Sequence, residues 1–353
     1  MKGSVNGMKK VTLRDVAEKC GVSFSLVSKV LRNKYQDGSS ISKEKADMVL
    51  KAAAEMGYVA DKQAQKLRTG KGHTVAVLIP LHPGFGNSVY PELMMGIMAV
   101  ASHSNYDFIF FHILDTEKEY HNLQEIVALN PDGIIYAVPP KHMSNDDTER
   151  TLALLNSLAS KNMPIIFAME QYDIPNSAIF RFDDFAGGYE GTKHLINKGY
   201  KKIGFCMSPF VERMNGYISA MTESHMNYNG LLYGMMHDSF VLPTGYRFFK
   251  DLYRQKYIKL PEAIFATCDI HAIGIIRAMS ELGLKPQEDI YILGYDGLPL
   301  TDIVETPFES VVQPVNQIGS DCAESIIKWI ETGVKPDDKT YLPTIKTTRE
   351  PIE

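Results

Sequence analysis

Along residues 11–31 the apolar positions recur at the three- and four-residue spacing of amphipathic helices. The stretch VTLRDVAEKCGVSFSLVSKVL predicts two short helices that are separated by only Gly21, Val22 and Ser23. The expected inward positions are Leu13, Val16, Ala17 and Cys20 in the first helix and Leu26, Val27, Val30 and Leu31 in the second. Thr12 and Asp15 predict a capping box, and Ser23 predicts an N-cap.

A third helix is expected from about residue 42 to residue 56, ending before Gly57. Its expected inward positions are Ala46, Val49, Leu50 and Ala53. Two helices joined by a three-residue turn, with a third helix closing the core, are typical of a helix-turn-helix, whose second helix enters the major groove of DNA. The pattern leaves the following residues of that second helix facing outward: Phe24, Ser25, Ser28, Lys29 and Arg32.

From residue 73 onward the pattern changes to short apolar runs that alternate with segments of helix length. Seven runs predict strands: VAVLIP at 75, FIFFHI at 108, GIIYAV at 133, PIIFAM at 164, KIGFCM at 202, AIFAT at 263 and IYILGY at 290. Nearly continuous Val, Ile and Phe runs separated by crossover helices indicate parallel sheets that are covered on both faces. Because about 280 residues exceed one comfortable core, we expect two doubly wound lobes.

Charge is divided unevenly between these two parts. Residues 1–71 hold 15 Lys and Arg against 7 Asp and Glu, a net +8, and the remaining residues hold 22 against 35, a net −13. A basic segment of this length favours a polyanionic partner, although a solvated lysine-rich face would show the same composition. The helix-turn-helix pattern favours DNA as that partner.

Composition excludes several other classes of protein. The first apolar run is broken by charges and no run approaches a membrane span, so we expect a cytoplasmic protein. The four cysteines lie far apart within apolar patterns, which favours buried free thiols over disulfides or a zinc site. The ten histidines are scattered without ligand spacing, and we expect neither a metal nor a cofactor.

Three linked motifs, VTLRDVAEKCGVSFSLVSKVL, KAAAEMGY and AQKLRTGKG, closely resemble the LacI/GalR family of bacterial transcription regulators over residues 11–72. The resemblance implies that Phe24, Ser25 and Lys29 read bases and that Leu67 is a wedge at a minor-groove base step. Together with the helix pattern it gives a candidate DNA-contacting set: Thr12, Phe24, Ser25, Ser28, Lys29, Arg32, Ala64 and Leu67.

The segment from Asp61 to Leu67 resembles the hinge helix of that family. It is too short to be a stable helix in water, so we expect it to order only on DNA, although a plain flexible linker would have the same length. Three features depart from the family pattern: the loop KYQDGSS is longer, Arg32 stands where asparagine is common, and Ala60 and Asp61 replace Pro-Asn. These departures concern operator sequence and hinge geometry more than DNA binding itself.

The resemblance also implies an α/β body like that of periplasmic sugar-binding proteins, with two doubly wound parallel-sheet lobes, behind a small all-α helix-turn-helix head. The expected organisation is a flexible tail at 1–10, the helix-turn-helix at 11–58, a hinge helix and linker at 59–72, and an effector-binding and dimerisation body at 73–353. Within the body we expect lobe one at about 73–170 and 300–330 and lobe two at about 171–299 and 331–353.

In open α/β sheets ligands bind beyond the carboxyl ends of the strands. Four segments there resemble family motifs in family order: DDFAGGY at 183, RMNGY at 213, FVLPTGY at 240 and GYDG at 294. The resemblance implies polar contacts from Arg213 and Asp296, an apolar wall at Phe240, and a contact from Tyr90 of the other lobe. The candidate effector-binding residues are Tyr90, Asp183, Arg213, Phe240, Asp269 and Asp296.

These residue types suit a polyol, because a guanidinium donates hydrogen bonds, a carboxylate accepts them from paired hydroxyls, and an aromatic face covers a sugar ring. A nucleobase or a small acid remains an alternative effector. Asp183 and Asp269 equally suit helix caps, and Arg213 equally suits an ion pair between the lobes. Cys268 stands where many relatives have asparagine, so one usual hydrogen-bonding group is missing.

The sequence therefore predicts a ligand-responsive, sequence-specific transcription regulator, a repressor that acts as a homodimer on operator DNA and responds to a small effector, a sugar or sugar derivative. Two rivals share the body fold. A solute-binding protein would carry a secretion signal and lack residues 11–72, and a sugar-acting enzyme would need catalytic motifs. The chain contains no nucleophile elbow, no G-x-x-x-x-G-K-S/T loop and no H-E-x-x-H pair.

Overall fold

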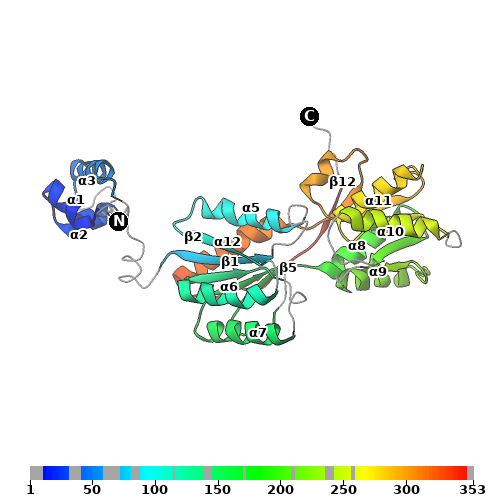
Figure 1. Cartoon of the computed structure of the whole chain (residues 1–353), viewed down its shortest axis with the longest axis horizontal. Helices are drawn as coiled ribbons and strands as arrows, with labels where there is room; N and C mark the ends of the chain where they lie inside the picture. Colours follow the sequence, from blue (N-terminus) through cyan, green and yellow to red (C-terminus); the bar gives the residue numbers. More distant parts are fainter. Residues whose placement is uncertain are drawn as a thin grey trace, which may run out of the picture. The chain divides into compact units, whose positions relative to one another are not determined.

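The computed structural model of the chain divides into two compact units, Met1–Gly72 and His73–Glu353, here called the head and the body (Figure 1). The boundary coincides with the expected end of the linker. The structure describes residues 11–31, 41–58, 72–80, 88–113, 116–138, 145–169, 172–207, 211–234, 242–255 and 259–347. The expected tail at 1–10 and the expected hinge helix at 61–67 lie outside the described residues.

The head contains the three expected helices, α1 (Leu13–Cys20), α2 (Phe24–Val30) and α3 (Lys43–Glu55). The capping box at the start of α1 is present, because the Thr12 hydroxyl accepts from the Asp15 backbone and the Asp15 carboxylate accepts from the Thr12 backbone. Gly21 ends α1 in the left-handed conformation, at φ 62°, which a glycine adopts without strain. Ser23 caps α2 by accepting from the Leu26 N–H.

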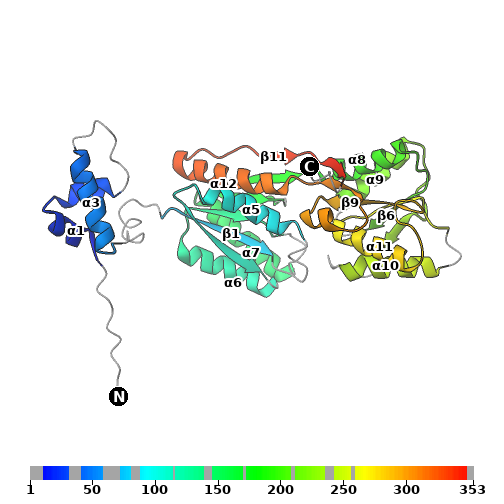
Figure 2. The same ribbon diagram turned by 90° about the horizontal axis from the view of Figure 1, so that it is seen from above.

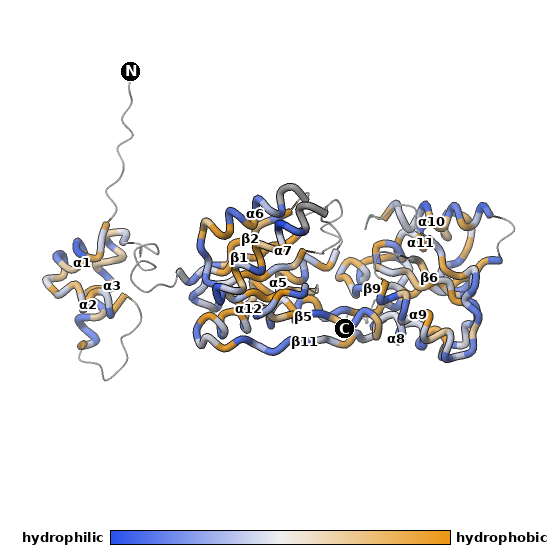
Figure 3. Tube along the Cα trace, turned by 90° about the horizontal axis from the view of Figure 1, so that it is seen from below, coloured by the Kyte–Doolittle hydropathy of each residue, from blue (hydrophilic) through white to orange (hydrophobic). Residues whose placement is uncertain are grey.

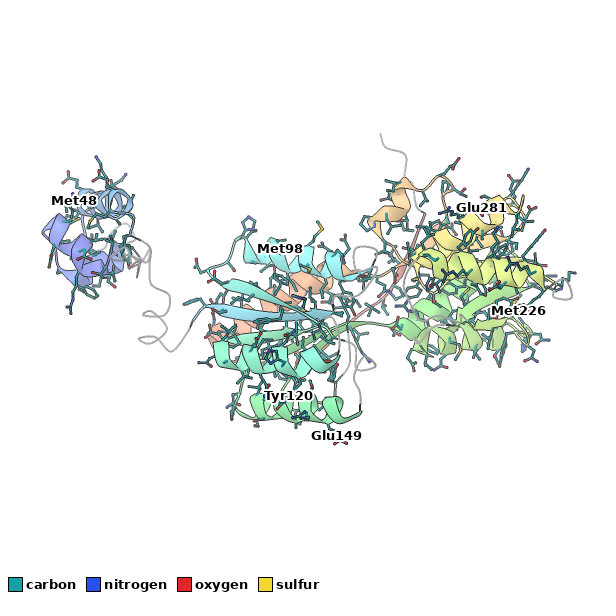
Figure 4. The ribbon with its side chains drawn as sticks, viewed as in Figure 1. Met48, Met98, Tyr120, Glu149, Met226 and Glu281 are labelled. Atoms are coloured by element: carbon teal, nitrogen blue, oxygen red, sulfur yellow. The ribbon has the colours of Figure 1, made fainter. Side chains whose placement is uncertain are left out.

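A small apolar core joins the three helices. Its fully buried residues include Val16, Val27 and Val49, as the spacing predicts. The prediction that Leu50 faces inward is wrong, because Leu50 is 46% exposed while Ala52 is buried. The buried stripe of α3 is centred on Val49 and its neighbours, and Leu50 lies about 100° further round the helix. Figure 4 shows Met48, another exposed residue of this helix, on the head.

The body contains two six-stranded sheets. The first has the order β11-β5-β4-β3-β1-β2 and all of its paired strands are parallel. Its strands in chain order are β1 (Thr74–Pro80), β2 (Asp107–Ile113), β3 (Gly133–Tyr136), β4 (Ile165–Ala168), β5 (Ala178–Phe182) and β11 (Lys339–Tyr341). The helices of this lobe are α5 (Tyr90–Ala101), α6 (Thr116–Leu129), α7 (Asn145–Ser160) and α12 (Val315–Thr332).

Strand β1 shows why this lobe has two cores. Val75, Val77 and Ile79 pack with α5 and α12 on one face, whereas Ala76 and Leu78 pack with α6 and α7 on the other. The strand is therefore apolar from Val75 to Ile79, and Figure 3 shows hydrophobic residues along it. Figure 2 shows α12 and α5 running beside each other.

The second sheet has the order β12-β10-β9-β8-β6-β7, with β12 antiparallel to β10 and the other pairs parallel. Its strands are β6 (Ile203–Met207), β7 (Leu232–Gly234), β8 (Ala263–Phe265), β9 (Tyr291–Asp296), β10 (Glu309–Val312) and β12 (Thr344–Thr347). The helices are α8 (Asp184–Asn197), α9 (Val211–Glu223), α10 (Leu242–Arg254) and α11 (Asp269–Glu281), followed by the 3-10 helix η3 (Pro299–Ile303). Helices α8 and α9 contribute to one core and α10 and α11 to the other.

All seven strands expected from the sequence are present, and both sheets are covered by helices on both faces. The expected lobe boundaries are wrong in detail. Strand β5 pairs with β4, so the first lobe extends past residue 170 to residue 182. Strand β10 belongs to the second sheet and β11 to the first, so the assignments of 300–330 to lobe one and of 331–353 to lobe two each hold only in part.

The described residues include all four cysteines, which the sequence predicts to be free thiols. Cys206, Cys268 and Cys322 are buried free thiols, and Cys20 is a half-buried one. In the part of the chain that the structure describes, no group of three or more His, Cys, Asp or Glu side chains is arranged so that it could hold a metal ion. None of the described helices is both long enough and apolar enough to cross a membrane.

Candidate functional site

Helix α2 presents a small exposed face on the head. Phe24 is 48% exposed, and Ser25 and Lys29 are also exposed. The prediction that Ser28 faces outward is wrong, because its side chain is 6% exposed. Helix α2 packs against both α1 and α3, so its buried sector is wider than the apolar stripe alone indicates. Thr12 is exposed at the start of α1, and Arg32, Ala64 and Leu67 lie outside the described residues.

The second candidate site is a polar cluster in lobe two, at the carboxyl ends of strands β8, β9 and β10. We call it the Arg213 cluster. Tyr295 and Asp296 end β9, Ser310 lies on β10, and the other members lie in loops or at helix starts that follow strands. Ligands bind at this edge in open α/β sheets. The cluster consists of Asp184, Arg213, Thr267, Asp269, Tyr295, Asp296, Ser310 and Gln313.

Arg213 lies at the centre of this cluster and is 2% exposed. Its Nε donates to Asp184 Oδ1 at 2.7 Å, and its Nη1 donates to the Thr267 carbonyl oxygen at 2.6 Å. The guanidinium also lies over the Tyr295 ring, with Cζ 3.8 Å from the ring centroid. These contacts all join Arg213 to residues of lobe two. They do not form the ion pair between the lobes that the sequence analysis kept as an alternative.

Asp296 lies at the end of β9, with its side chain 10% exposed and 3.7 Å from Arg213 Nη1. Its backbone has φ 115°, which is unusual for a residue with a side chain. Gln313 stabilises this conformation at two points: its backbone N–H donates to the Asp296 carbonyl oxygen at 3.1 Å, and its Nε2 donates to Oδ1 at 2.6 Å. The strained backbone and both hydrogen bonds orient the Asp296 carboxylate.

Asp269 is fully buried at the start of α11. Its Oδ1 accepts from the Ser310 hydroxyl at 2.6 Å and its Oδ2 accepts from the Leu298 N–H at 2.7 Å. A Cβ atom on Gly294 would lie 2.3 Å from Asp269 Oδ1, so the GYDG segment needs glycine at this position for the carboxylate to fit. Asp269 does not cap α11, because the N-cap residue is Cys268, without a side-chain cap.

Burial and mutual repulsion set the protonation of these carboxyl groups. Burial raises the pKa of Asp269 to about 7, and its hydrogen bonds only partly oppose this shift. Burial also raises the pKa of Asp296 well above its usual value, while Arg213 lowers it and the neighbouring carboxylates raise it. Burial alone would lower the pKa of Arg213, but the Asp184 and Asp296 carboxylates keep its pKa above the usual value.

The remaining candidate residues have other surroundings. Asp183 is the N-cap of α8 and accepts from the Ala186 N–H at 2.8 Å, so the helix-cap role that the sequence left open is present. Tyr90, the first residue of α5, is 8% exposed and belongs to the core of lobe one. Phe240 lies outside the described residues. Cluster members not named in the sequence analysis are Asp184, Thr267, Tyr295, Ser310 and Gln313.

Two of these had a signal in the sequence. Asp184 stands next to Asp183, in the same motif. Tyr295 lies inside the GYDG motif. Thr267 is the last residue of the expected strand AIFAT, and it lies two residues after the end of β8. Ser310 and Gln313 lie on or after β10, which the apolar pattern did not predict.

Comparison with known proteins gives a family match for the head and another for the part of the body that contains most of the Arg213 cluster. The family model "Bacterial regulatory proteins, lacI family" matches residues 12–61, and the model "Periplasmic binding protein-like domain" matches residues 192–350. The chain is 30% identical to the NTD biosynthesis operon regulator NtdR of Bacillus subtilis, over 96% of this chain and 99% of the relative. The chain belongs to the LacI family. It is therefore a DNA-binding transcription regulator and not an enzyme.

Other members of the LacI family are similar along most of the chain. Catabolite control protein A of Priestia megaterium is 27% identical over 94% of this chain and 96% of its own length. The transcriptional repressor PurR of Haemophilus influenzae is 26% identical over 90% of this chain and 91% of its own length.

A solved structure shows the same fold. The crystal structure of the Lac repressor dimer bound to operator and the anti-inducer ONPF superposes with a TM-score of 0.78, at 21% identity, over 96% of this chain and 99% of that chain. The expected helix-turn-helix head and two-lobed α/β body are therefore confirmed.

Proposed function

We propose that this LacI-family regulator is a cytoplasmic repressor that binds a two-fold symmetric operator as a homodimer and responds to a sugar or sugar derivative bound at the Arg213 cluster. The observation that carries the proposal is the buried, hydrogen-bonded guanidinium of Arg213 beside two partly exposed carboxylates at the carboxyl ends of parallel strands. Such a set offers the donors and acceptors that paired hydroxyl groups need.

The exposed face of α2 supports the DNA-reading part of the proposal. Phe24, Ser25 and Lys29 lie on a helix that follows a tight turn, which is the geometry that brings a recognition helix into the major groove. Paired recognition helices of a dimer match half-sites about one helical turn apart. In the Lac repressor structure that resembles this chain, a dimer is bound to its operator.

Relatives support a small-molecule effector. The LacI-family regulator from Enterococcus faecium, which is 23% identical over 79% of this chain, is described with bound ribose and superposes with a TM-score of 0.65. In the proposed mechanism, the effector changes the arrangement of the two lobes and thereby the population of ordered hinge segments, which sets the affinity for DNA.

The DNA-reading part is tested with the full chain by selecting duplexes from a random pool and then measuring anisotropy titrations. We expect a symmetric site to be enriched, and we expect Lys29→Ala to reduce discrimination at particular base pairs by about 1–3 kcal/mol. Lys51→Ala is the matched control, because it removes the same charge from an exposed position on α3. Failure to enrich any sequence, or equal effects of the two substitutions at every base pair, would refute the assignment of α2.

The effector part is tested by the melting temperature of the full chain in the presence of sugars, sugar derivatives and nucleobases. A ligand that binds the native state raises the melting temperature, and loss of the rise in an Arg213→Lys variant that still folds would connect it to the cluster. A rise that is unchanged by this substitution would place the effector elsewhere.

A further inference from the structure

The Arg213 cluster contains more acidic groups than its own cation neutralises. Arg213 pairs with Asp184 at 2.7 Å and approaches Asp296 at 3.7 Å. Asp269 has hydrogen bonds from Ser310 and Leu298 but no ion pair within the described part of the chain. Among the residues that the structure describes, one guanidinium therefore serves three carboxyl groups.

The pKa values of two of these carboxyl groups are raised, chiefly by burial. Burial raises the pKa of Asp269 to about 7, and burial together with the neighbouring carboxylates raises that of Asp296. Both groups therefore bind a proton more readily than a free carboxyl group does, because burial disfavours their charged forms and Arg213 is the one cation beside them among the described residues. A ligand that brings a positive charge would stabilise the ionised carboxylates in place of those protons.

The cluster also contains hydrogen-bond acceptors without donors. Gln313 is 5% exposed, and while its Nε2 donates to Asp296, its Oε1 has no partner among the described residues. The Thr267 hydroxyl oxygen is fully buried and also has no hydrogen-bond partner within the described part of the chain. Because a buried acceptor without a donor is costly, Gln313 Oε1 indicates a ligand that supplies a donor.

Two of the carboxyl groups remain within reach of a ligand. The Asp184 side chain keeps 25% of its surface exposed although it pairs with Arg213, and the Asp296 side chain keeps 10%. Asp269 has no exposed surface. Of the three carboxyl groups, Asp184 and Asp296 are therefore the ones that a ligand can reach.

We propose that the effector is a cation, an amino sugar or amino polyol whose protonated amine binds between Asp184, Asp296 and the Gln313 carbonyl. The inference rests on the proposed function, since it takes the Arg213 cluster to be the effector site. An ammonium group supplies three donors and no acceptor, which matches the surplus of acceptors. Sugar phosphates and small acids would bring a further negative charge next to Asp184 and Asp296, so the cluster disfavours them.

The experiment compares matched ligands on the full chain. Glucosamine, galactosamine and mannosamine are each titrated against the parent hexose and the N-acetyl derivative, with the melting temperature and then calorimetry as readouts. We expect at least one amine to bind about tenfold or more tightly than its neutral partners, because its hydrogen bonds to the carboxylates are charge-assisted. Neutral hexoses that bind as tightly as the amines, or amines that do not bind, would overturn the proposal.

A pair of variants tests whether the Asp184 carboxylate causes the preference for the amine. Asp184→Asn keeps an oxygen that accepts from Arg213 Nε but removes one negative charge, so the preference for the amine over the neutral hexose should fall. Asp251→Asn, on the exposed side of α10 in the same lobe, is the control and should leave the preference unchanged. An unchanged preference in Asp184→Asn would also overturn the proposal.

Failure of this inference is distinguishable from failure of the proposed function. Tight binding of a neutral sugar that is lost in Arg213→Lys would refute the cationic effector and leave the Arg213 cluster as the effector site. Enrichment of an operator sequence is measured separately and does not depend on either result.

Discussion

The head and lobe two place their functional side chains in opposite surroundings. On α2 the candidate base readers are exposed on the outside of a small apolar core, so they remain in contact with water until DNA binds. In the Arg213 cluster the functional groups are mostly buried and depend on one another for hydrogen bonds. Substitutions on α2 should therefore change recognition with little effect on stability, whereas substitutions in the cluster should change both.

The largest expected effect is on the buried cation. Arg213→Met should reduce the free energy of unfolding of the body by about 3–5 kcal/mol, because it leaves the carboxylates of Asp184 and Asp296 without their cation. Chemical denaturation of the full chain measures this effect. A loss below 1 kcal/mol would show that the cluster is not held together by its guanidinium.

The pH dependence of stability should be the next largest effect. The pKa of Asp269 is raised to about 7 in the folded chain, above its value of about 4 in the unfolded chain. The folded state therefore binds more protons between these values, and this group's contribution falls by roughly 2–4 kcal/mol as the pH rises from 4 to 7. Asp269→Asn should remove that part of the slope in unfolding experiments at several pH values, and an identical slope in both proteins would contradict the assignment.

Two apolar residues on α3 test the head core. Val49 is fully buried and Leu50 is 46% exposed, although the apolar pattern predicted both to face inward. Val49→Ala should reduce the stability of the head by roughly 2 kcal/mol, and Leu50→Ala by at most about 0.5 kcal/mol. Denaturation followed by the circular dichroism of the helices measures the loss of stability in both variants. A larger loss for Leu50→Ala than for Val49→Ala would contradict the described packing.

The last comparison concerns DNA binding by two serines on α2. Ser25 is exposed and Ser28 is buried, so Ser25→Ala should weaken binding to the selected operator by about 1 kcal/mol, the value of one hydrogen bond. Ser28→Ala should leave operator affinity nearly unchanged. The opposite order in anisotropy titrations would mean that Ser28 turns toward DNA in the complex.

The sequence predicted the long, strongly apolar elements well, because a strand buried on both faces, such as β1 or β9, leaves a continuous hydrophobic run. It did not predict β5, β7, β10, β11 or β12. These strands are short, and several carry polar or charged residues, as in ESVV of β10 and KTY of β11. The missed strands include those that exchange between the two sheets, which is why the lobe boundaries were wrong.

The candidate site was predicted where a motif marked it and missed where only three-dimensional contact defines it. Arg213, Asp269 and Asp296 lie in the cluster, whereas Asp183 caps a helix and its neighbour Asp184 pairs with Arg213. A helix N-cap and the next residue point in different directions, and the sequence pattern does not distinguish which one reaches Arg213. Gln313 follows β10, so without that strand it had no predicted position.

The proposed regulation requires that a small molecule bound in the body changes the affinity of the head for DNA. The most direct test measures the dissociation constant of the full chain for its selected duplex, with and without the sugar that raises the melting temperature most. We predict a change of roughly 5- to 150-fold, and an equal change in sugar affinity when the duplex is present, because such coupling is reciprocal. Equal affinity for the duplex with and without saturating sugar would contradict the claim.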